Sequence, residues 1–128
     1  MTEFRELHAT IICLQAGKIL LVRKAAPEWS LPGGKMDHGE TQVEAARREL
    51  REETTLELVA AQFLGHHVLV SEEHWLYRMT VTASKTPSPS HEIVECHWFN
   101  IQELKLAPVK PITIELLKRE GFLAPSSH

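Results

Sequence analysis

Residues 33–53 read GGKMDHGETQVEAARRELREE, and this stretch carries the strongest structural signal in the chain. Thr41 followed three residues later by Glu44 is the pattern of a capping box, in which each side chain binds the other residue's backbone amide. Good helix formers fill the next positions, and two β-branched residues, Thr54 and Thr55, follow them. The stretch therefore predicts a glycine-rich loop and then a helix that begins after Thr41 and ends at the two threonines.

The predicted helix carries more carboxylates than its own cations can neutralise. Glu44 and Glu52 each have Arg48 four residues away, where an ion pair can form. Glu49 and Glu53 have no cation three or four residues away, and they lie one turn apart, where like charges repel each other. A hard divalent cation, Mg2+ or Mn2+, would neutralise this pair. The alternative is a basic residue from elsewhere in the fold.

One face of the same helix is predicted to pack on a sheet. At about 100° per residue, one stripe contains Val43, Ala46, Leu50 and Thr54. The two unpaired glutamates lie beside this stripe, so we expect their carboxylates at the edge of a buried face.

The loop before the helix bears on ligand binding. Gly33 and Gly34 let the backbone approach a ligand closely, so that its carbonyls or amides can act as ligands. The P-loop pattern GxxxxGK[ST] does not occur in the sequence, so we expect a phosphate to be bound through a metal. Glu40 lies just before the helix cap and could reach Arg48 or a metal-bound water.

The rest of the chain predicts strands and a second helix. Two apolar runs separated by Ala16-Gly17 predict a hairpin. No long helix separates the later strands, which favours antiparallel pairing, and the segment SKTPSPS predicts a mobile loop. Pro111 and Gly121 mark the start and end of the second helix. The predicted strands are residues 7–15, 18–24, 56–64, 75–83 and 92–99, with a short extended piece at 30–31.

Length and composition limit the class of protein. A chain of 128 residues, 43% hydrophobic and 24% charged, predicts one globular domain over residues 1–128, in which helices cover a mixed sheet. A net charge of -3 excludes general binding to duplex nucleic acid. No apolar run reaches the roughly 18 residues that span a bilayer, and the start lacks the apolar core of a signal peptide, so we expect a cytoplasmic location. Cys13 and Cys96 predict reduced, buried thiols.

The spacing of the charged residues resembles the Nudix box, G-x5-E-x7-R-E-U-x-E-E-x-G-U, in which U is a bulky apolar residue. Eight of its nine specified positions match: Gly34, Glu40, Arg48, Glu49, Leu50, Glu52, Glu53 and Leu56. The preceding WSLPGGK and the later EIVECHWFNIQEL are also similar to the family, so the resemblance covers most of the chain. The one departure is Thr55, where the family has a glycine that ends the helix with a positive φ, which a β-branched residue disfavours.

The resemblance implies a fold and a chemistry. It implies an α/β (α+β) fold of the Nudix type, an α-β-α sandwich with helices on both faces of a mixed sheet. Nudix enzymes hydrolyse a nucleoside diphosphate linked to another moiety, using Mg2+ or Mn2+. The implied metal ligands are the Gly33 carbonyl and the carboxylates of Glu49, Glu52 and Glu53.

The resemblance also implies roles for the neighbouring residues. Arg48 would orient the carboxylates, and Glu40 would support the loop or a metal-bound water. Either Glu49 or Glu52 could act as general base.

Further candidates for substrate binding flank the glycine loop. Arg23, Lys24 and Lys35 could meet substrate phosphates by charge-assisted hydrogen bonds, or could be ordinary solvated cations. Trp29 could stack on a base, although an aromatic residue at such a turn more often closes a core. With Gly34, whose backbone can approach a ligand closely, these residues are the substrate-binding candidates.

Two further metal hypotheses rest on residues outside the motif. Glu92 or Glu95 could complete the metal site from the late strand, or could point to the opposite face. His66, His67 and His74 invite a zinc hypothesis, but neither HExxH nor regular His/Cys spacing supports it.

The leading functional hypothesis is a pyrophosphohydrolase of nucleoside diphosphate derivatives, with a (deoxy)nucleoside triphosphate as substrate. Within the enzymes, the alternatives are nucleotide sugars, dinucleoside polyphosphates and capped RNA ends. Outside the enzymes, the alternative is a non-catalytic Nudix-fold module that senses a nucleotide. The expected partner is a small nucleotide, with neither duplex nucleic acid nor a membrane, and the sequence leaves a homodimer open.

Overall fold

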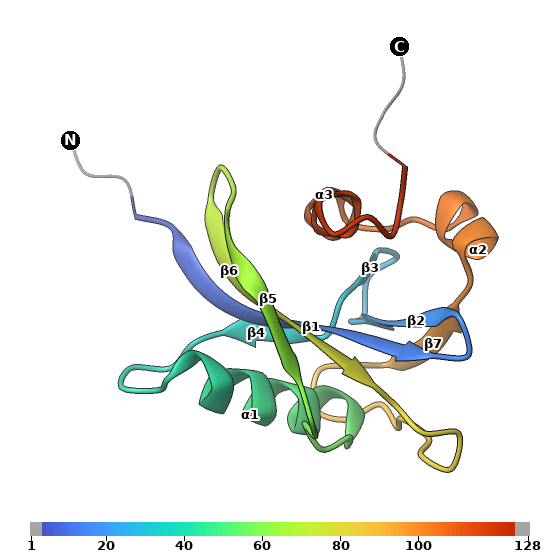
Figure 1. The fold of residues 1–128 in the computed structure, drawn as a ribbon, viewed down its shortest axis with the longest axis horizontal. Helices are drawn as coiled ribbons and strands as arrows, with labels where there is room; N and C mark the ends of the chain where they lie inside the picture. Colours follow the sequence, from blue (N-terminus) through green and yellow to red (C-terminus); the bar gives the residue numbers. More distant parts are fainter. Residues whose placement is uncertain (1–3, 125–128) are drawn as a thin grey trace.

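The computed structural model describes residues 4–124, which form one seven-stranded sheet with helices on both faces (Figure 1). Helix α1 covers one face, and α2 and α3 lie on the other. The helices are α1 (Gln42–Thr54), α2 (Ile101–Leu106) and α3 (Pro111–Arg119). The strands are β1 (Glu6–Gln15), β2 (Lys18–Arg23), β3 (Trp29–Ser30), β4 (Gly33–Lys35), β5 (Gln62–Val68), β6 (Glu72–Thr80) and β7 (Glu95–Phe99). Within residues 4–124, no helix is long and apolar enough to cross a bilayer.

The sheet is mixed, as the sequence predicts. Its main order is β3-β2-β1-β6-β5, with β4 paired to β1 and β7 paired to β2. All pairs are antiparallel except β1 and β6, which run parallel in a register that places His8 beside His74. The antiparallel prediction for the late strands therefore holds for β5 with β6 and for β7 with β2, and it misses the parallel pairing that joins the two halves of the chain.

Alternation along β1 divides the core into two layers. Ala9, Ile11 and Cys13 face α1, whereas Ile12 faces the side covered by α2 and α3. Both sets are fully buried. The two cysteines are free, but only Cys13 is buried as predicted, whereas Cys96 is half-buried. Burial raises the pKa of the Cys13 thiol to about 12.

Three sequence predictions need correction. The strand predicted at 56–64 begins at Gln62, because the chain first crosses the end of α1 in an irregular segment that buries Leu56. Helix α2 is absent from the elements predicted from the sequence, although Asn100 and Glu103 form a capping box at its start. Val43, expected in the buried stripe, is 39% exposed.

The reason for the Val43 error is a rotation of the buried face of α1. Ala45 is fully buried, so the face runs along Ala45, Glu49 and Glu53 as well as along the stripe that includes Leu50. The rotation turns Glu49 and Glu53 toward the sheet.

The end of α1 carries local strain. Thr55 has φ 63° and ψ 2°, the left-handed conformation that Gly adopts freely and that a β-branched residue adopts at a cost of roughly 1–2 kcal/mol. Its backbone amide still caps the helix by donating to the Arg51 carbonyl. The backbone at the end of α1 therefore has the left-handed conformation typical of glycine, although the residue is a threonine.

We expect Thr55→Gly to stabilise the protein by about 1 kcal/mol, because the strain outweighs the greater backbone entropy of glycine in the unfolded chain. Thr55→Ala should give a smaller gain, since it removes only the β-branching. Thermal unfolding of the three proteins measures this order. A loss of stability in the glycine variant would show that contacts of the threonine side chain outweigh its backbone strain.

Candidate active site

A cavity of about 670 Å³ opens beside β1, β4 and the start of α3. Two of its glutamates, Glu49 and Glu53, come from α1, and Gly33 and Gly34 come from β4. Six glutamates and three lysines line it: Glu6, Glu28, Glu49, Glu53, Glu72, Glu92, Lys24, Lys35 and Lys110. The excess of carboxylates would repel a phosphate unless cations are bound with it.

Glu53 is the most perturbed acid of the site. Its side chain is 9% exposed, and its carboxylate Oε1 accepts a hydrogen bond from the Gly33 amide at 2.9 Å. Burial is the main cause that raises the pKa of Glu53 to about 8, with a smaller contribution from the charge of Glu49, and the Gly33 amide and the charge of Lys24 act in the opposite direction. Among residues 4–124, Glu53 makes no ion pair, so the prediction that it lacks a local cation is confirmed.

Glu49 fills the space that Gly34 leaves open. A Cβ atom on Gly34 would lie 2.6 Å from the Glu49 carboxyl carbon. Burial raises the pKa of Glu49, and the guanidinium of Arg48 opposes that shift. Arg48 Nη1 lies 2.8 Å from Glu49 Oε1, so the prediction that Glu49 lacks a cation on its own helix is wrong: the adjacent residue reaches it.

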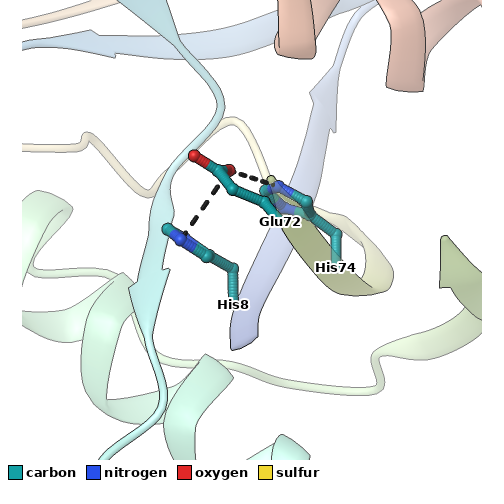
Figure 2. A group of neighbouring side chains, drawn as sticks. All are labelled: His8, Glu72 and His74. Carbon is teal, nitrogen blue, oxygen red and sulfur yellow. Dashed lines mark hydrogen bonds and ion pairs between the residues drawn. The ribbon is translucent and has the colours of Figure 1, made fainter. Parts of the chain in front are cut away.

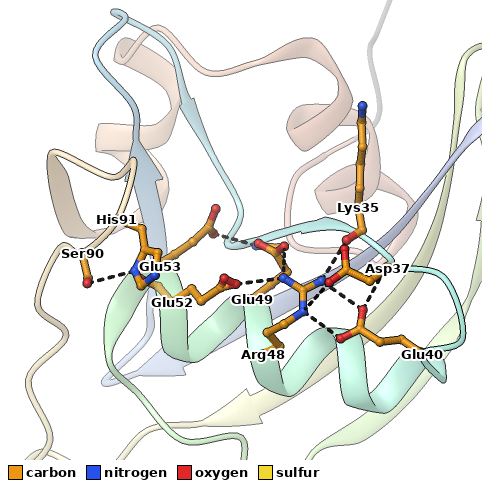
Figure 3. A network of polar contacts seen from close by, with 10 residues as sticks. Lys35, Asp37, Glu40, Arg48, Glu49, Glu52, Glu53, Ser90 and His91 are labelled. Carbon is orange, nitrogen blue, oxygen red and sulfur yellow. Dashed lines mark hydrogen bonds and ion pairs between the residues drawn. The ribbon is translucent and has the colours of Figure 1, made fainter.

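Arg48 lies at the centre of a network of carboxylates (Figure 3). Its guanidinium donates to Glu52 Oε1 at 2.8 Å and to Glu40 Oε2 at 2.7 Å, and it lies 3.4 Å from Asp37. It also donates to the Lys35 carbonyl, which ties α1 to β4. The hydrogen bonds from Arg48 lower the pKa of Glu40. One guanidinium thus contacts the carboxylates of three glutamates, Glu40, Glu49 and Glu52.

The helix acid Glu44 has a different partner from the one predicted. Its carboxylate accepts from the Thr41 amide at 2.8 Å, and the Thr41 hydroxyl accepts from the Glu44 amide. The capping box is therefore confirmed, and it uses the carboxylate that was also expected to pair with Arg48.

The loop after β6 closes the carboxyl end of α1. The Ser88 amide donates to the Thr54 carbonyl at 2.8 Å, and the Ser90 amide donates to the Glu53 carbonyl at 3.3 Å. His91 Nδ1 lies 3.1 Å from the Glu52 carbonyl. The segment predicted only as a loop therefore satisfies backbone groups beside the acidic residues.

The substrate-binding candidates separate into two groups. Gly34 and Lys35 line the cavity, although the Lys35 ammonium pairs with Glu6 at 2.9 Å. Arg23 and Trp29 are not among the residues that line it. Trp29 packs edge-on against Phe99, with ring centroids 4.9 Å apart, in agreement with the core alternative for this aromatic residue.

The two acids of the predicted late strand, Glu92 and Glu95, lie in different places. Glu95 forms an ion pair with Arg23, away from the cavity. Glu92 lines the cavity and lies 3.6 Å from the Lys24 ammonium. Of the two acids considered for the metal site, only Glu92 is therefore close to Glu53.

The histidines do not gather as the zinc hypothesis requires. His66 pairs with Glu73 at 2.8 Å, and His67 pairs with Glu120 at 3.0 Å. His74 lies in the cavity wall, where burial lowers its pKa. Its neighbour there is His8 of β1, which sequence spacing could not reveal because only the parallel β1–β6 pairing brings the two residues together.

Gly34→Ala is expected to separate activity from stability. The new methyl group would displace the flexible end of Glu49 rather than a backbone atom, so we expect a stability loss below about 1 kcal/mol. If Glu49 takes the catalytic role that the resemblance implies, activity should fall about 100-fold, the cost of misplacing such a group by about 1 Å. Gly33→Ala is the contrasting variant, because its Cβ would lie 2.3 Å from the Ala9 carbonyl oxygen and must shift backbone. Thermal unfolding and turnover of both variants test this difference.

The NUDIX domain family model matches residues 5–119, almost the whole described chain. The chain belongs to the Nudix family. The Bacillus subtilis protein named "Putative 8-oxo-dGTP diphosphatase" is 32% identical over 99 residues, covering 75% of this chain and 66% of that protein. The Escherichia coli CTP pyrophosphohydrolase is 30% identical over 115 residues, covering 84% of each. The Nudix domain of Shewanella oneidensis NrtR, solved in complex with ADP ribose, superposes with a TM-score of 0.81 at 17% identity, covering 95% of this chain and 91% of that one.

Membership of the Nudix family confirms two sequence-based predictions. The fold is the expected α+β sandwich, and the chain is a hydrolase of phosphorus-containing anhydrides at the level of its family. The residues also fit the divalent metal that Nudix hydrolases generally use. Glu53 is a nearly buried carboxylate next to a second one, and hard cations prefer such oxygen ligands.

Proposed function

We propose that this Nudix protein hydrolyses the pyrophosphate of small nucleotides, with a (deoxy)nucleoside triphosphate as the leading substrate, and that one domain carries the whole site. The observation that carries the proposal is the pair Glu49 and Glu53: two carboxylates that share the buried edge of α1, open into a cavity, and bear raised pKa values. The names of two relatives, "Putative 8-oxo-dGTP diphosphatase" and "CTP pyrophosphohydrolase", support the triphosphate class.

In the proposed reaction, water adds to a phosphorus atom and the anhydride P–O bond breaks, which gives two phosphate-containing products. A divalent metal, Mg2+ or Mn2+, supplies charge neutralisation at the phosphoryl oxygens and a lower pKa for the attacking water. We propose Glu49 and Glu53, which line the cavity, as its ligands, with the Gly33 carbonyl as a further one. Glu52, the third ligand that the resemblance implies, does not line the cavity and stays a prediction.

The side chains of this chain then have distinct tasks. Arg48 holds Glu49 and Glu52 in fixed positions by hydrogen bonds of 2.8 Å. Glu40 holds Arg48 from the other side and closes the loop by accepting from the Asp37 amide. Of the two candidates for general base, Glu49 is favoured, because it lines the cavity whereas Glu52 does not.

The lysines that line the cavity are suited to bind those substrate phosphates that lie farther from the proposed metal. Lys24, Lys35 and Lys110 line the cavity, and substrate phosphates could displace the carboxylate partners of the first two. An ammonium group meets phosphate as a point charge on a flexible stem, which tolerates different substrates. Arg23 and Trp29 are not needed for this proposal.

A panel of purified substrates tests the proposal. Nucleoside triphosphates, 8-oxo-dGTP, nucleotide sugars, dinucleoside polyphosphates and capped RNA are incubated with Mg2+ or Mn2+, and the released phosphate compounds are identified. We expect metal-dependent release from at least one triphosphate and none with a chelator. Nucleotide binding without any hydrolysis would contradict the proposal and indicate a sensing module, whereas hydrolysis of another class alone would replace the triphosphate assignment.

A further inference from the structure

Three side chains of the cavity wall converge on one point, away from α1 (Figure 2). The Glu72 carboxylate lies between two imidazoles: its Oε1 is 2.7 Å from His74 Nε2 and 3.7 Å from His8 Nε2. All three ligand atoms lie within 4.8 Å of one another. Two imidazole nitrogens and one carboxylate oxygen are a donor set that binds zinc in proteins.

The sheet itself assembles this cluster. In the parallel β1–β6 register, Glu6 lies beside Glu72 and His8 beside His74. Residues two apart on a strand share a face, so Glu72, His74 and His8 must project to the same side of the sheet. The ligand atoms are therefore positioned by regular strands rather than by a loop.

The cluster also has a partner that orients its buried histidine. His74 is 5% exposed, and its Nδ1 lies 2.7 Å from the hydroxyl oxygen of Thr10, itself 4% exposed. A hydroxyl can accept from Nδ1–H, which leaves the Nε2 lone pair free to bind a metal. The His8 ring stacks on the His74 ring with centroids 4.9 Å apart, so both imidazoles are held by packing.

We propose that His8, Glu72 and His74 form a second metal site, distinct from the α1 carboxylates, which binds Zn2+ or a similar transition metal. Mg2+ prefers oxygen ligands alone, whereas imidazole nitrogen suits zinc, cobalt and copper. All three residues line the cavity, so the open coordination position faces it and is available to a water or to an oxygen of a bound ligand.

The competing explanation is a hydrogen-bonded cluster without metal. His74 Nε2–H could donate to Glu72 while the Thr10 hydroxyl donates to Nδ1. His8 Nε2 would then be bonded to Glu6, whose Oε1 lies 3.2 Å away. The two explanations differ in one measurable property, the affinity of the metal-free chain for a transition metal in excess Mg2+. This measurement does not involve hydrolysis, so it stands apart from the proposed function.

The experiment uses Co2+ as a spectroscopic substitute for Zn2+, in the full chain carrying Glu49→Gln and Glu53→Gln and in excess Mg2+, so that the α1 site does not contribute. We expect one Co2+ per chain, with visible absorption typical of a four-coordinate site, nitrogen ligands in X-ray absorption, and displacement by Zn2+. No Co2+ absorption above that of the free ion would overturn the proposal.

Variants locate the ion. His8→Ala and His74→Ala should each abolish the Co2+ absorption, and Thr10→Val should weaken Co2+ binding about 10- to 100-fold through the orientation of His74. His66→Ala is the matched control, because His66 also pairs with a glutamate of β6 but lies outside the cluster, and it should bind Co2+ as before.

Thermal unfolding shows whether each variant is folded. His8 is the more exposed of the two histidines, so the test remains decisive if His74→Ala unfolds. Equal Co2+ binding by the parent chain and His8→Ala would overturn the proposal. Either result leaves the Mg2+-dependent reaction to be judged by its own assay.

Discussion

Glu53→Gln should lower turnover by roughly two orders of magnitude or more, the cost of removing a strong preorganised charge from an active site. The substitution keeps the shape of a side chain that is 9% exposed and removes only its capacity to ionise. The Gly33 amide can still donate to the amide oxygen of the new side chain, so the loop should stay in place. We expect this loss because, in the proposed site, the metal would lose a ligand and a negative charge. Turnover is measured with the best substrate of the panel, over a range of Mg2+ concentrations.

Glu57→Gln is the matched control for this change. Glu57 is an exposed acid just beyond α1 that pairs with Arg51, outside the cavity. We expect its substitution to leave turnover within about twofold, since exposed pairs contribute little. Near-normal turnover in Glu53→Gln, with an unchanged Mg2+ dependence, would rule out Glu53 as a metal ligand.

The same substitution has a second readout that does not depend on activity. The pKa of Glu53 is raised from 4.5 to about 8 in the folded protein, so between these pH values the folded state holds a proton that the unfolded state has lost. The free energy of unfolding of the metal-free protein should therefore fall as pH rises through this window, by up to a few kcal/mol. In Glu53→Gln this part of the slope should vanish. Equal slopes in both proteins would show that Glu53 is not held protonated by burial.

The charged motif was predictable from sequence because its contacts are local. Thr41, Glu44 and Arg48 act over one or two helical turns, so spacing alone indicates which groups can meet. The capping box and the Arg48–Glu52 pair are present as predicted. The adjacent pair Arg48–Glu49 was missed, because helical spacing considers residues three or four apart and neglects how far a long guanidinium side chain can reach.

The cavity wall was not predictable because it depends on strands that are distant in sequence. His8 and His74 are separated by 66 positions and meet only through the parallel register of β1 and β6. For Trp29, core packing was the more frequent alternative considered, but its bridge partner Val109, 80 positions away, could not be identified from sequence. A single sequence indicates the chemistry of the motif and leaves open which other side chains complete the site.

Thr55 shows that a sequence can differ from a motif in residue type and still keep the backbone conformation of the motif. The family glycine was expected to be needed for the positive φ, and Thr55 adopts φ 63° all the same. The neighbouring contacts explain why the exit holds. Thr54 is fully buried, its hydroxyl donates to the Leu50 carbonyl at 2.7 Å, and its own carbonyl accepts from the Ser88 amide.

Arg48→Ala should lower turnover by about 100-fold, because three acidic side chains lose the cation that positions them. Without the guanidinium, the carboxylates of Glu49 and Glu52 repel each other about one helical turn apart. The hydrogen bond from Arg48 to the Lys35 carbonyl, which holds the glycine loop to α1, is also lost. We expect an unfolding free energy lower by about 2 kcal/mol, less than for a fully buried pair because the Arg48 side chain is 29% exposed. Turnover and denaturant unfolding measure the two effects.

Arg51→Ala is the control that separates position from charge. Arg51 lies on the same helix and binds Glu57 through two nitrogen atoms, but its side chain is 58% exposed and does not line the cavity. The Arg51→Ala substitution removes one positive charge, as Arg48→Ala does. We expect it to lower the unfolding free energy by less than about 0.5 kcal/mol and to leave turnover close to normal. Arg48→Lys completes the set: it keeps the charge and loses the planar fork, so turnover should stay well below that of the wild type. If Arg48→Lys restored full activity, charge alone would explain the role of Arg48, and the proposal that its geometry positions the carboxylates would be wrong.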